Sequence, residues 1–545
     1  MTTGSDGITP MNATQPESPF RLIPRTSARP SIKGLFASAA ERMLAFPWMN
    51  SIYHAAYEAP GDKGFNERVL DAMRVHWGLA EADRRRIPAS GPLIVVANHP
   101  YGGLEGVVLA AVLRSVRPDV KLLANYLLGC IPEMRDQFIF VDPFGGPDAA
   151  RKNVGGMKAA MRWLRQGGVL GIFPAGEVAH LTWKSRCVTD PHWSETVGRL
   201  ALQTGAPVLP FYFSGRNSGL FQAAGLIHPR LRTALLPREM KRRSDQTIDV
   251  RVGTVIKPER LARFKTPSEV TSYLRLRTYI LKGRSPAAQK SDDAGPAVVN
   301  NIPLAAPVVA PQPKEAIAAE IAGLPADACQ FASGEFQVFI TKADAIPLTL
   351  REIGRLREIT FRIVGEGTGR EIDLDRFDDH YLHLFVWNKV KEHIVGAYRL
   401  GLSDRILRER GVDGFYTRTL FKYGEKLPLE IGPSLEAGRS FIVAEYQKSH
   451  SALSMLWKGM GRFIVANPRY RHIFGPVSIS DRYHSMTKQL LLAFLQTADH
   501  RAALSRLVQA TNPPRWGRFR DCDERELSTI VRSVEDVDEL VGEIE

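Results

Sequence analysis

Short apolar runs alternate with helix-like patterns between residues 90 and 285, and this alternation most limits what the chain can fold into. Apolar runs bounded by turn residues predict buried strands, and strands separated by helices predict a parallel sheet covered on both faces. The predicted strands are PLIVVA, VKLLA, FIFV, GGVLGIF, APVLPFYF and TIDVRVG. The first half of the chain is therefore expected to form an α/β domain.

A second ordered region follows a stretch rich in Pro and Ala. Residues 286–325 contain few large apolar side chains, so they predict a flexible linker. Strand patterns (FQVFI, LHLFVW, HIVGAYRL) and helix patterns (LREIGRLREITF, SALSMLWKGMGRFIVA) then resume. We expect two α/β domains, at residues 31–285 and 326–545, preceded by a mobile N-terminus at residues 1–30.

The basic charge of the chain lies in its first part. Residues 1–300 hold 40 Lys and Arg against 25 Asp and Glu, whereas the net charge of the whole chain is +14. This excess indicates a polyanionic partner, either nucleic acid or an anionic membrane, or else a solvated basic face. The cluster RLRTALLPREMKRR interleaves leucines with cations and lacks a nucleic-acid motif, which favours a membrane surface and no nucleic acid. The expected membrane-facing residues are Arg230, Arg232, Arg238, Lys241, Arg242 and Arg243.

Several features indicate the compartment. The four cysteines lack zinc or redox spacing, which predicts a reduced cytosolic protein without a metal site. Neither a secretory signal nor an apolar stretch of the ~20 residues that a spanning helix needs is evident. Residues 34–57 predict an amphipathic helix that lies in the membrane interface or, as we favour, packs on its own domain. We expect a cytoplasmic protein that is peripheral on the inner face of the membrane.

The segment ANHPYGGLEG follows the first predicted strand and contains His99 and Glu105. Gly102 and Gly103 allow the chain to fold back, because glycine accepts a positive φ. A carboxylate bonded to one imidazole nitrogen would leave the other nitrogen as a general base for a hydroxyl nucleophile. The alternative is an ordinary strand exit in which His99 has a structural role.

Three further blocks decide between these alternatives. The segments FIFVDPFGG, GIFPAGEVAH and GAPVLPFYFSGRNS follow predicted strands in the same order. Together with the His-acid segment they resemble the glycerolipid acyltransferase family, in which four such blocks line one cleft. The resemblance implies that His99 is the general base and that Glu105 takes the place of the acid. The acid stands six residues after the histidine, whereas the family usually has it five residues after.

The departures from the family pattern concern the acceptor. Pro143 stands where the family commonly has Arg, and the third block carries Gly176 and Glu177 without the basic residue that would meet a phosphate. Fewer cations and an added anion favour a zwitterionic or cationic head group. This pattern resembles the haemolysin-like branch, which includes the O-acyltransferases of ornithine-lipid synthesis. Arg216 and Asn217 are expected either to hold the acceptor's carboxylate or merely to cap a loop.

The second domain carries a D-x-D-x-x-D cluster before two predicted strands, followed by LEIGPSLEAGRSFIVAEYQ. These blocks resemble the acetyltransferase-like (GNAT) N-acyltransferases that make lyso-ornithine lipid. In that family the acidic cluster and an E-x-x-R pair organise the amine acceptor and the acyl carrier protein donor. The alternative is a solvated acidic loop. The residues implied are Asp373, Asp375 and Asp378 with Arg357 and Arg399 for binding, and Glu436 and Arg439 for catalysis.

Taken together, the two domains resemble the bifunctional ornithine-lipid synthases. The resemblance implies that the second domain transfers a 3-hydroxyacyl chain from acyl carrier protein, or from coenzyme A, to ornithine. The first domain would then acylate the new hydroxyl of lyso-ornithine lipid, and neither step needs a tightly bound cofactor. Three alternatives stay open: glycine or another amino-acid acceptor, a lysophospholipid acyltransferase with an inert second domain, and a haemolysin-like membrane-binding protein without activity.

Overall fold

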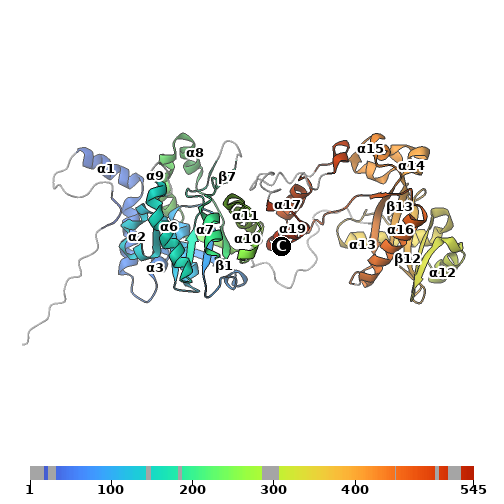
Figure 1. The fold of residues 1–545 in the computed structure, drawn as a ribbon, viewed down its shortest axis with the longest axis horizontal. Helices are drawn as coiled ribbons and strands as arrows, with labels where there is room; N and C mark the ends of the chain where they lie inside the picture. The colour runs from blue at the N-terminus through green and yellow to red at the C-terminus, as the bar shows by residue number, and fades with distance from the viewer. Residues whose placement is uncertain are drawn as a thin grey trace, which may run out of the picture. The chain divides into compact units, whose positions relative to one another are not determined.

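The chain consists of two compact units (Figure 1). The first contains Met1–Ser291, Gln489–Thr497 and Arg518–Glu545, and the second contains Asp292–Lys488 and Ala498–Gly517. The computed structural model describes residues 18–21, 32–142, 149–181, 187–284, 306–448, 450–497, 502–513 and 530–545.

The first unit is built on a seven-stranded sheet. In spatial order its strands are β1 (His76–Leu79), β9 (Thr247–Val252), β8 (Val208–Phe213), β2 (Leu93–Ala97), β5 (Val169–Ile172), β3 (Val120–Asn125) and β4 (Phe138–Val141). Neighbouring strands are parallel except β8 and β9. Every residue of β2 is buried, as expected for a central parallel strand covered on both faces. The six predicted strands are present, and β1 is an additional edge strand.

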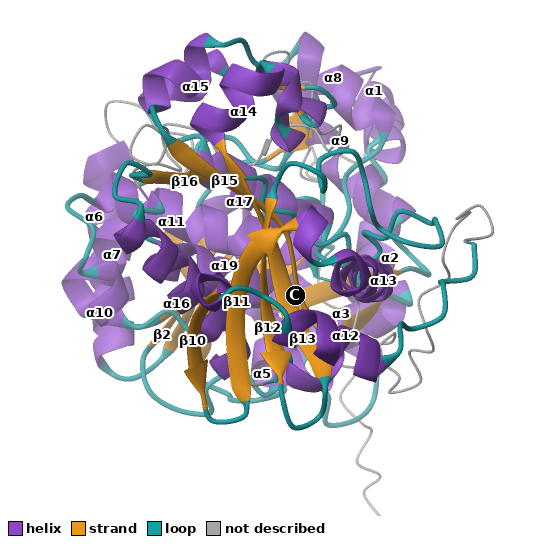
Figure 2. Ribbon diagram, turned by 90° about the vertical axis from the view of Figure 1, so that its right-hand side faces the viewer, coloured by secondary structure: helices purple, strands orange, loops and turns teal. Residues whose placement is uncertain are grey.

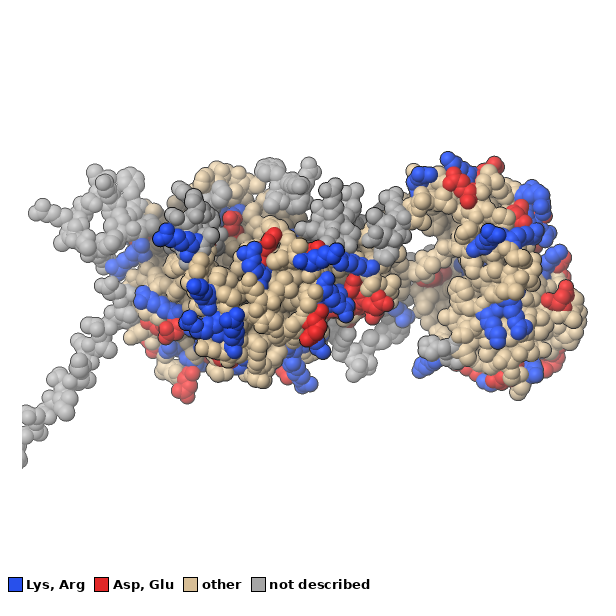
Figure 3. Space-filling view, viewed as in Figure 1, with Lys and Arg blue, Asp and Glu red and all other residues tan. Residues whose placement is uncertain are grey.

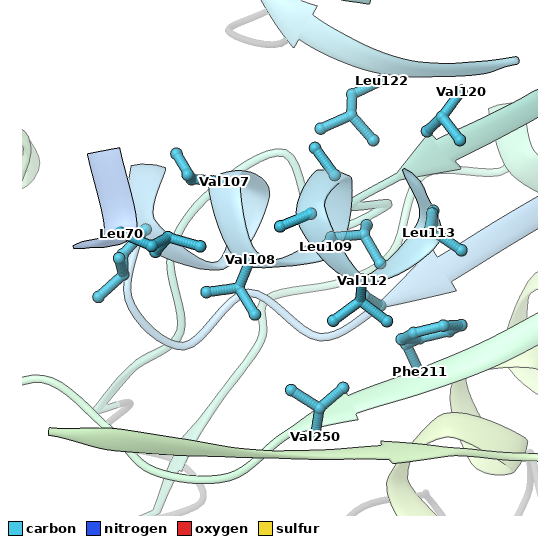
Figure 4. Close-up of a cluster of buried hydrophobic side chains, with 14 of the residues drawn as sticks. Leu70, Val107, Val108, Leu109, Val112, Leu113, Val120, Leu122, Phe211 and Val250 are labelled. Carbon is cyan, nitrogen blue, oxygen red and sulfur yellow. The ribbon is translucent and has the colours of Figure 1, made fainter. Parts of the chain in front are cut away.

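Helices cover both faces of this sheet. They are α1 (Ile32–Met43), α2 (Phe46–Glu58), α3 (Phe65–Met73), α4 (Glu81–Arg84), α5 (Gly103–Arg114), α6 (Ala149–Arg165), α7 (Thr196–Thr204), α8 (Gly219–Ile227), α9 (Pro229–Arg242), α10 (Pro258–Leu261), α11 (Pro267–Tyr279) and α19 (Val534–Ile544), with a small hairpin of β6 (His180–Leu181) and β7 (Val188–Thr189). Figure 4 shows α5 in the core, with Val108 and Val112 near Val250 and Phe211. This packing fixes the start of α5, which follows β2 after the turn at residues 98–102.

The predicted helix at residues 34–57 is two helices, because the chain turns at Ala45, which has a φ of 64°. The second of them, α2, buries Tyr53 and Ala56 in the core of the first unit. Packing on its own domain, the favoured alternative, is therefore confirmed for α2. Among the helices that the structure describes, none combines the length and apolarity needed to cross a bilayer.

The last helix of the chain, α19, belongs to the first unit, although the sequence placed it in the second domain. Figure 1 shows α19 beside α10 and α11. Its apolar side chains Val537, Leu540 and Ile544 are buried. Glu543, which is also buried, lies 3.0 Å from the buried guanidinium of Arg277 on α11. The expected boundary was wrong because these long-range contacts are not visible in local sequence.

The second unit is built on a six-stranded sheet. Its strands are β10 (Cys329–Ser333), β11 (Phe336–Lys342), β12 (Leu382–Asn388), β13 (His393–Leu402), β15 (Ser434–Ile442) and β16 (His472–Phe474), in that spatial order. All neighbouring pairs are antiparallel except β15 and β16. A separate small sheet pairs β14 (Phe421–Lys422) with β17 (Gln509–Ala510).

Helices also cover both faces of this sheet. They are α12 (Lys314–Ala322), α13 (Pro347–Ile363), α14 (Ser403–Arg410), α15 (Lys426–Ile431) and α16 (His450–Ala466), whereas the residues of α17 (Ser485–Leu495) are divided between the two units. Successive residues of β12 point to opposite faces, so Phe385 and Trp387 join one core and Leu384 and Val386 join the other. Figure 2 shows α13 and α16 on opposite sides of the strands.

The predicted linker at residues 286–325 is too long. Residues 285–305 lie outside the described part, but from residue 306 onward the chain is built into the second unit. The amide of Val309 donates to the carbonyl of Glu371, and α12 buries Ile317 and Ile321. A few apolar residues at helical spacing were enough to order a segment of low overall complexity.

Candidate functional site

The four blocks noted in the sequence of the first unit all follow carboxyl ends of parallel strands. His99 follows β2, the second block follows β4, Phe173 follows β5 and Arg216 follows β8. Carboxyl ends of parallel strands lie along one edge of the sheet, where open α/β folds place their ligand sites. The end of the second block, including Pro143, lies outside the described residues.

His99 and Glu105 meet at this edge. Glu105 stands in the first turn of α5, and its Oε1 lies 2.7 Å from Nδ1 of His99. The same oxygen accepts the backbone N–H groups of Tyr101 at 3.0 Å and Gly102 at 2.9 Å. The anchored carboxylate thus reaches back across the turn. Glutamate, one methylene longer than aspartate, compensates for its position six residues after the histidine.

Gly102 makes this turn possible. Its φ is 108°, a conformation that L-residues with a side chain avoid. A Cβ at this position would also lie 2.8 Å from a methyl carbon of Leu236 on α9. Gly103, in contrast, has open space around it. The Gly-Gly pair is therefore asymmetric, and the first glycine carries the constraint.

The imidazole of His99 is suited to act as a base. Burial lowers the pKa of His99, but the carboxylates of Glu105 and Asp190 outweigh it, so the pKa lies above its ordinary value. Glu105 is fully buried, while 17% of the His99 side chain is exposed. The ring stacks on Phe173, with centroids 4.7 Å apart. With Nδ1 facing Glu105, Nε2 is the nitrogen that can take a proton from a hydroxyl.

Asp190 is a site residue that the sequence did not indicate. Its side chain is buried; Oδ1 accepts the backbone N–H of His99 at 3.1 Å, and Oδ2 accepts the indole N–H of Trp193 at 2.9 Å. Burial raises the pKa of Asp190, although these bonds and His99 oppose the shift. Only the string TDPHW, a carboxylate close to a tryptophan, could have drawn notice to it.

Glu177 does not stand as a free anion at the site. Its Oε2 lies 2.6 Å from Nη2 of Arg232, whose side chain is only 7% exposed. The inference that this block adds an anion for a cationic head group was therefore wrong about the charge, because Arg232 neutralises it. Gly176 precedes it in a turn with a φ of 67°.

The fourth block, GAPVLPFYFSGRNS, contacts the turn that holds His99 and Gly102. Asn217 is buried, and its Nδ2 donates to the carbonyl of Tyr101 at 3.4 Å, while Arg216 is exposed. The guanidinium of Arg243 lies over the Tyr101 ring, 4.5 Å from its centroid. Arg216, Arg242 and Arg243 line a small pocket of about 110 Å³. Arg216 is thus available to a ligand, whereas Asn217 supports the loop.

The basic cluster on α9 divides by position. Arg238, Lys241 and Arg242 are exposed, and Arg243 is half-buried. Arg232 was expected to face a membrane, and this expectation is wrong because the residue is buried against Glu177. The side chain of Arg230 lies outside the described part. Figure 3 shows Lys and Arg in several separate groups on the visible face of the first unit.

In the second unit the three aspartates are packed against arginines. Asp378 lies between Arg357 and Arg399, at 3.2 Å from each, and Asp375 accepts from Arg399 at 2.6 Å. Asp373 lies 3.3 Å from Arg439. The alternative of a solvated acidic loop is therefore wrong, because the loop is folded onto a cluster of guanidinium groups.

The pKa values follow from these pairings. Burial alone would raise the pKa of Asp378, but Arg357 and Arg399 lower it overall. Burial dominates at Asp373 and raises its pKa despite Arg357 and Arg439. His383, buried beside the same arginines, has its pKa lowered to about 4, chiefly by burial, and is neutral at physiological pH. Asp373 is thus more readily protonated than Asp378.

Glu436 and Arg439, expected as a catalytic pair, turn to different partners. Glu436 is buried and accepts the N–H of Thr417 at 2.6 Å and the hydroxyl of Tyr381. Arg439 lies at a bulge of β15, where the register with β13 shifts and its φ is 51°. The bulge directs Arg439 toward Asp373. Glu436 therefore anchors the Tyr416–Thr419 turn, whereas Arg439 keeps 17% of its side chain exposed.

Comparisons with known proteins also divide the chain into two domains. The family described as "Acyltransferase" matches residues 38–288, and that described as "Acetyltransferase (GNAT) domain" matches residues 356–458. A glycine N(alpha)-acyltransferase of Phocaeicola vulgatus is 35% identical over 170 residues, which are 29% of this chain and 52% of that protein. The chain thus spans about half the length of this relative.

Two further proteins are similar to parts of the chain. A lyso-glycine lipid O-acyltransferase of Bacteroides thetaiotaomicron is 27% identical over 199 residues, 35% of this chain and 70% of that protein. The crystal structure of a 1-acyl-sn-glycerophosphate acyltransferase from Thermotoga maritima is 17% identical, with a TM-score of 0.27, and covers 47% of this chain and 98% of that one. From its fold and its two family matches, the chain is a two-domain protein in which an acyltransferase domain precedes a GNAT-type domain.

Proposed function

We propose that the chain assembles an amino-acid lipid by two successive acyl transfers. In the second unit, the neutral α-amine of an amino acid attacks the thioester of a 3-hydroxyacyl donor, forming the C–N bond while the C–S bond breaks and the thiol leaves. In the first unit, the new 3-hydroxyl loses its proton to His99 and attacks a second acyl thioester, so that a C–O bond forms, the C–S bond breaks and the thiolate leaves with the proton that His99 took up. The observation that carries the proposal is the distance of 2.7 Å between Glu105 and His99.

The accessible groups of the second cluster support an amino-acid acceptor. Asp375 and Arg439 each keep 17% of their side chains exposed, whereas Asp378 is buried. A carboxylate and a guanidinium match the ammonium and carboxylate of an α-amino acid. Asp373 is fully buried 3.3 Å from Arg439, so it positions that guanidinium, and the departing thiolate takes up the proton that the amine releases.

The donor in this proposal is an acyl thioester carried by acyl carrier protein or coenzyme A. Pairing between β15 and β16 covers only Ser434–Glu436, whereas β13 pairs with β15 as far as Ile442. An extended pantetheine arm fits against the edge of β15 beyond Glu436, because backbone groups there can bond to it. This edge starts beside Arg439, so the thioester would lie close to the acceptor.

The head group is proposed to be ornithine, with glycine as the alternative. Three carboxylates of the cluster (Asp373, Asp375 and Asp378) contact three arginines (Arg357, Arg399 and Arg439), and a fourth carboxylate, Glu436, is bonded to Tyr381 and Thr417. The excess negative charge complements ornithine, which carries one net positive charge, better than glycine, which carries none. The names of the relatives favour glycine. The product would form at the inner face of the cytoplasmic membrane.

Lipid analysis of a host that lacks amino-acid lipids tests the proposal. Cells that express the chain and receive isotope-labelled ornithine and glycine should make a labelled diacyl lipid, and mass spectrometry identifies its head group. His99→Ala should stop the second transfer, so that the monoacyl lipid accumulates. The proposal is wrong if neither amino acid enters the lipid fraction, or if His99→Ala leaves the diacyl product unchanged. Acylation of lysophosphatidate alone would identify a lysophospholipid acyltransferase instead.

A further inference from the structure

Helix α8 presents an apolar face to solvent. Leu220 is 52% exposed, Leu226 36% and Ile227 78%, while Phe221 and Gln222 are buried. A surface helix of a soluble domain normally shows the reverse arrangement, with its polar residues outward. The exposed residues of α8, all without polar side chains, are Gly219, Leu220, Ala223, Leu226 and Ile227.

The helix is held rigidly in this orientation. Ser218, the N-cap residue of α8, donates its hydroxyl to Glu239 on α9 at 2.6 Å and its backbone N–H to the same carboxylate at 2.9 Å. Gly225 lies so close to Arg232 that a Cβ there would be 3.3 Å from the arginine's Cδ. Arg232 is in turn paired with Glu177. The apolar face is therefore a fixed feature of a closed hairpin, with its tip at Ile227.

The exposed side chains of α9 change from apolar near its start to basic near its end. Leu231, near the tip, is 46% exposed, and the exposed cations Arg238, Lys241 and Arg242 lie toward the other end of the helix. An apolar tip with cations behind it matches a bilayer surface, in which acyl chains lie below anionic head groups. An exposed apolar patch bordered by charges is uncommon on a protein that has no partner.

The basic end of the hairpin adjoins the His99 turn. Leu236 on α9 lies against Gly102, and Arg243, directly after α9, lies over the Tyr101 ring. We propose that the α8–α9 hairpin, residues 219–243, docks the first unit on an anionic membrane. The inference rests on the proposed function in one respect, since a lyso-lipid acceptor would then reach His99 from the bilayer. An acidic carrier protein is the competing partner, and the exposed isoleucine and leucines favour the membrane over it.

Vesicle binding by the full-length chain tests this docking. Vesicles that contain phosphatidylglycerol should bind the chain more tightly than vesicles of phosphatidylcholine alone, and added salt should reduce the difference. Leu226→Glu combined with Ile227→Glu should weaken binding roughly tenfold or more, because two apolar side chains no longer enter the bilayer. Leu202→Glu, at a 38% exposed leucine on α7, is the matched control and should bind normally. Circular dichroism verifies that each variant is folded.

The outcomes separate the docking from the proposed function. Unchanged vesicle binding by the double variant would overturn the proposal, as would absence of binding by the unaltered chain. If the double variant still binds vesicles but no longer cross-links to acyl carrier protein, the hairpin binds that carrier protein instead of the membrane. In detergent micelles, the double variant should still acylate a lyso-lipid. If the unaltered chain binds vesicles through the hairpin but makes no amino-acid lipid, the docking stands and the proposed function fails.

Discussion

The carboxylate of Asp190 accepts the backbone N–H of His99 at 3.1 Å, and it does so from a segment more than ninety residues further along the chain. A buried acid thus holds the turn on which the proposed base stands. Because its charge also acts on the imidazole, Asp190 affects both the position of His99 and its pKa.

Replacing Asp190 by Asn should move the pH profile of O-acylation. Asn keeps an oxygen for the His99 N–H but removes the charge, so the pKa of His99 falls. Because His99 must be neutral to act as a base, the acidic limb of the profile shifts to lower pH, although the maximal rate also drops. The charged groups that act on Asp190 are His99 and Arg275, and its carboxylate also accepts the indole N–H of Trp193. Asp71→Asn, at an exposed pair with Lys63, should leave the limb in place. An unmoved limb in Asp190→Asn would show that the charge does not reach His99.

The rate of O-acylation should depend on both the charge and the length of the Glu105 side chain. Glu105→Gln removes the negative charge beside Nδ1, and Glu105→Asp shortens the side chain that reaches back to His99. Each change is expected to reduce the rate of O-acylation by about 100-fold or more, while N-acylation continues. Single-turnover assays of each transfer measure this. An active Glu105→Asp enzyme would mean that the reach of the side chain is unimportant.

The two adjacent glycines should respond differently to alanine. Gly102→Ala forces a side chain into a left-handed conformation and against Leu236, so it should lower the free energy of unfolding by about 1–2 kcal/mol or more and reduce O-acylation. Gly103→Ala, in open space at the start of α5, should be neutral or slightly stabilising. Urea denaturation distinguishes the two, and equal effects would contradict the asymmetry of the turn.

Two aspartates of the second unit should have different effects when replaced: Asp375 on substrate binding and Asp378 on stability. Asp375→Ala removes an accessible carboxylate, so we expect a higher KM for the amino acid in N-acylation. Asp378→Ala leaves Arg357 and Arg399 buried without their shared partner, which should cost about 3–5 kcal/mol of stability. Steady-state kinetics and urea denaturation measure the two effects. A destabilised Asp375→Ala with an unchanged KM would assign that residue to the structure alone.

The C-terminal helix should stabilise the first unit rather than the second. Glu543→Ala leaves Arg277 on α11 with one carboxylate partner, Glu539, instead of two, and we expect a loss of about 3 kcal/mol in the unfolding of the first unit. Asp538→Ala, at an exposed position of the same helix, should change stability little. Hydrogen exchange resolved by segment shows which unit loosens; loosening confined to the second unit would contradict the assignment.

The sequence by itself determined the local elements. Short apolar runs bounded by turn residues, such as LIVVA, predicted central strands, and the spacing of apolar residues predicted α13 and α16. It also determined which residues stand at strand ends, so the region around His99 could be named before the structure was known. These features depend on neighbours in the chain, and periodicity records them directly.

Only the tertiary structure decided which charges meet. It paired Glu177 with Arg232, brought Asp190 to His99 and returned α19 to the first unit. The partners in these contacts are far apart in sequence and leave no local pattern, so composition suggested free charges where the fold holds neutral pairs. Burial requires such pairing, because an isolated charge inside a protein is costly. The sequence thus determines which charged side chains are present, whereas long-range packing determines which of them form pairs.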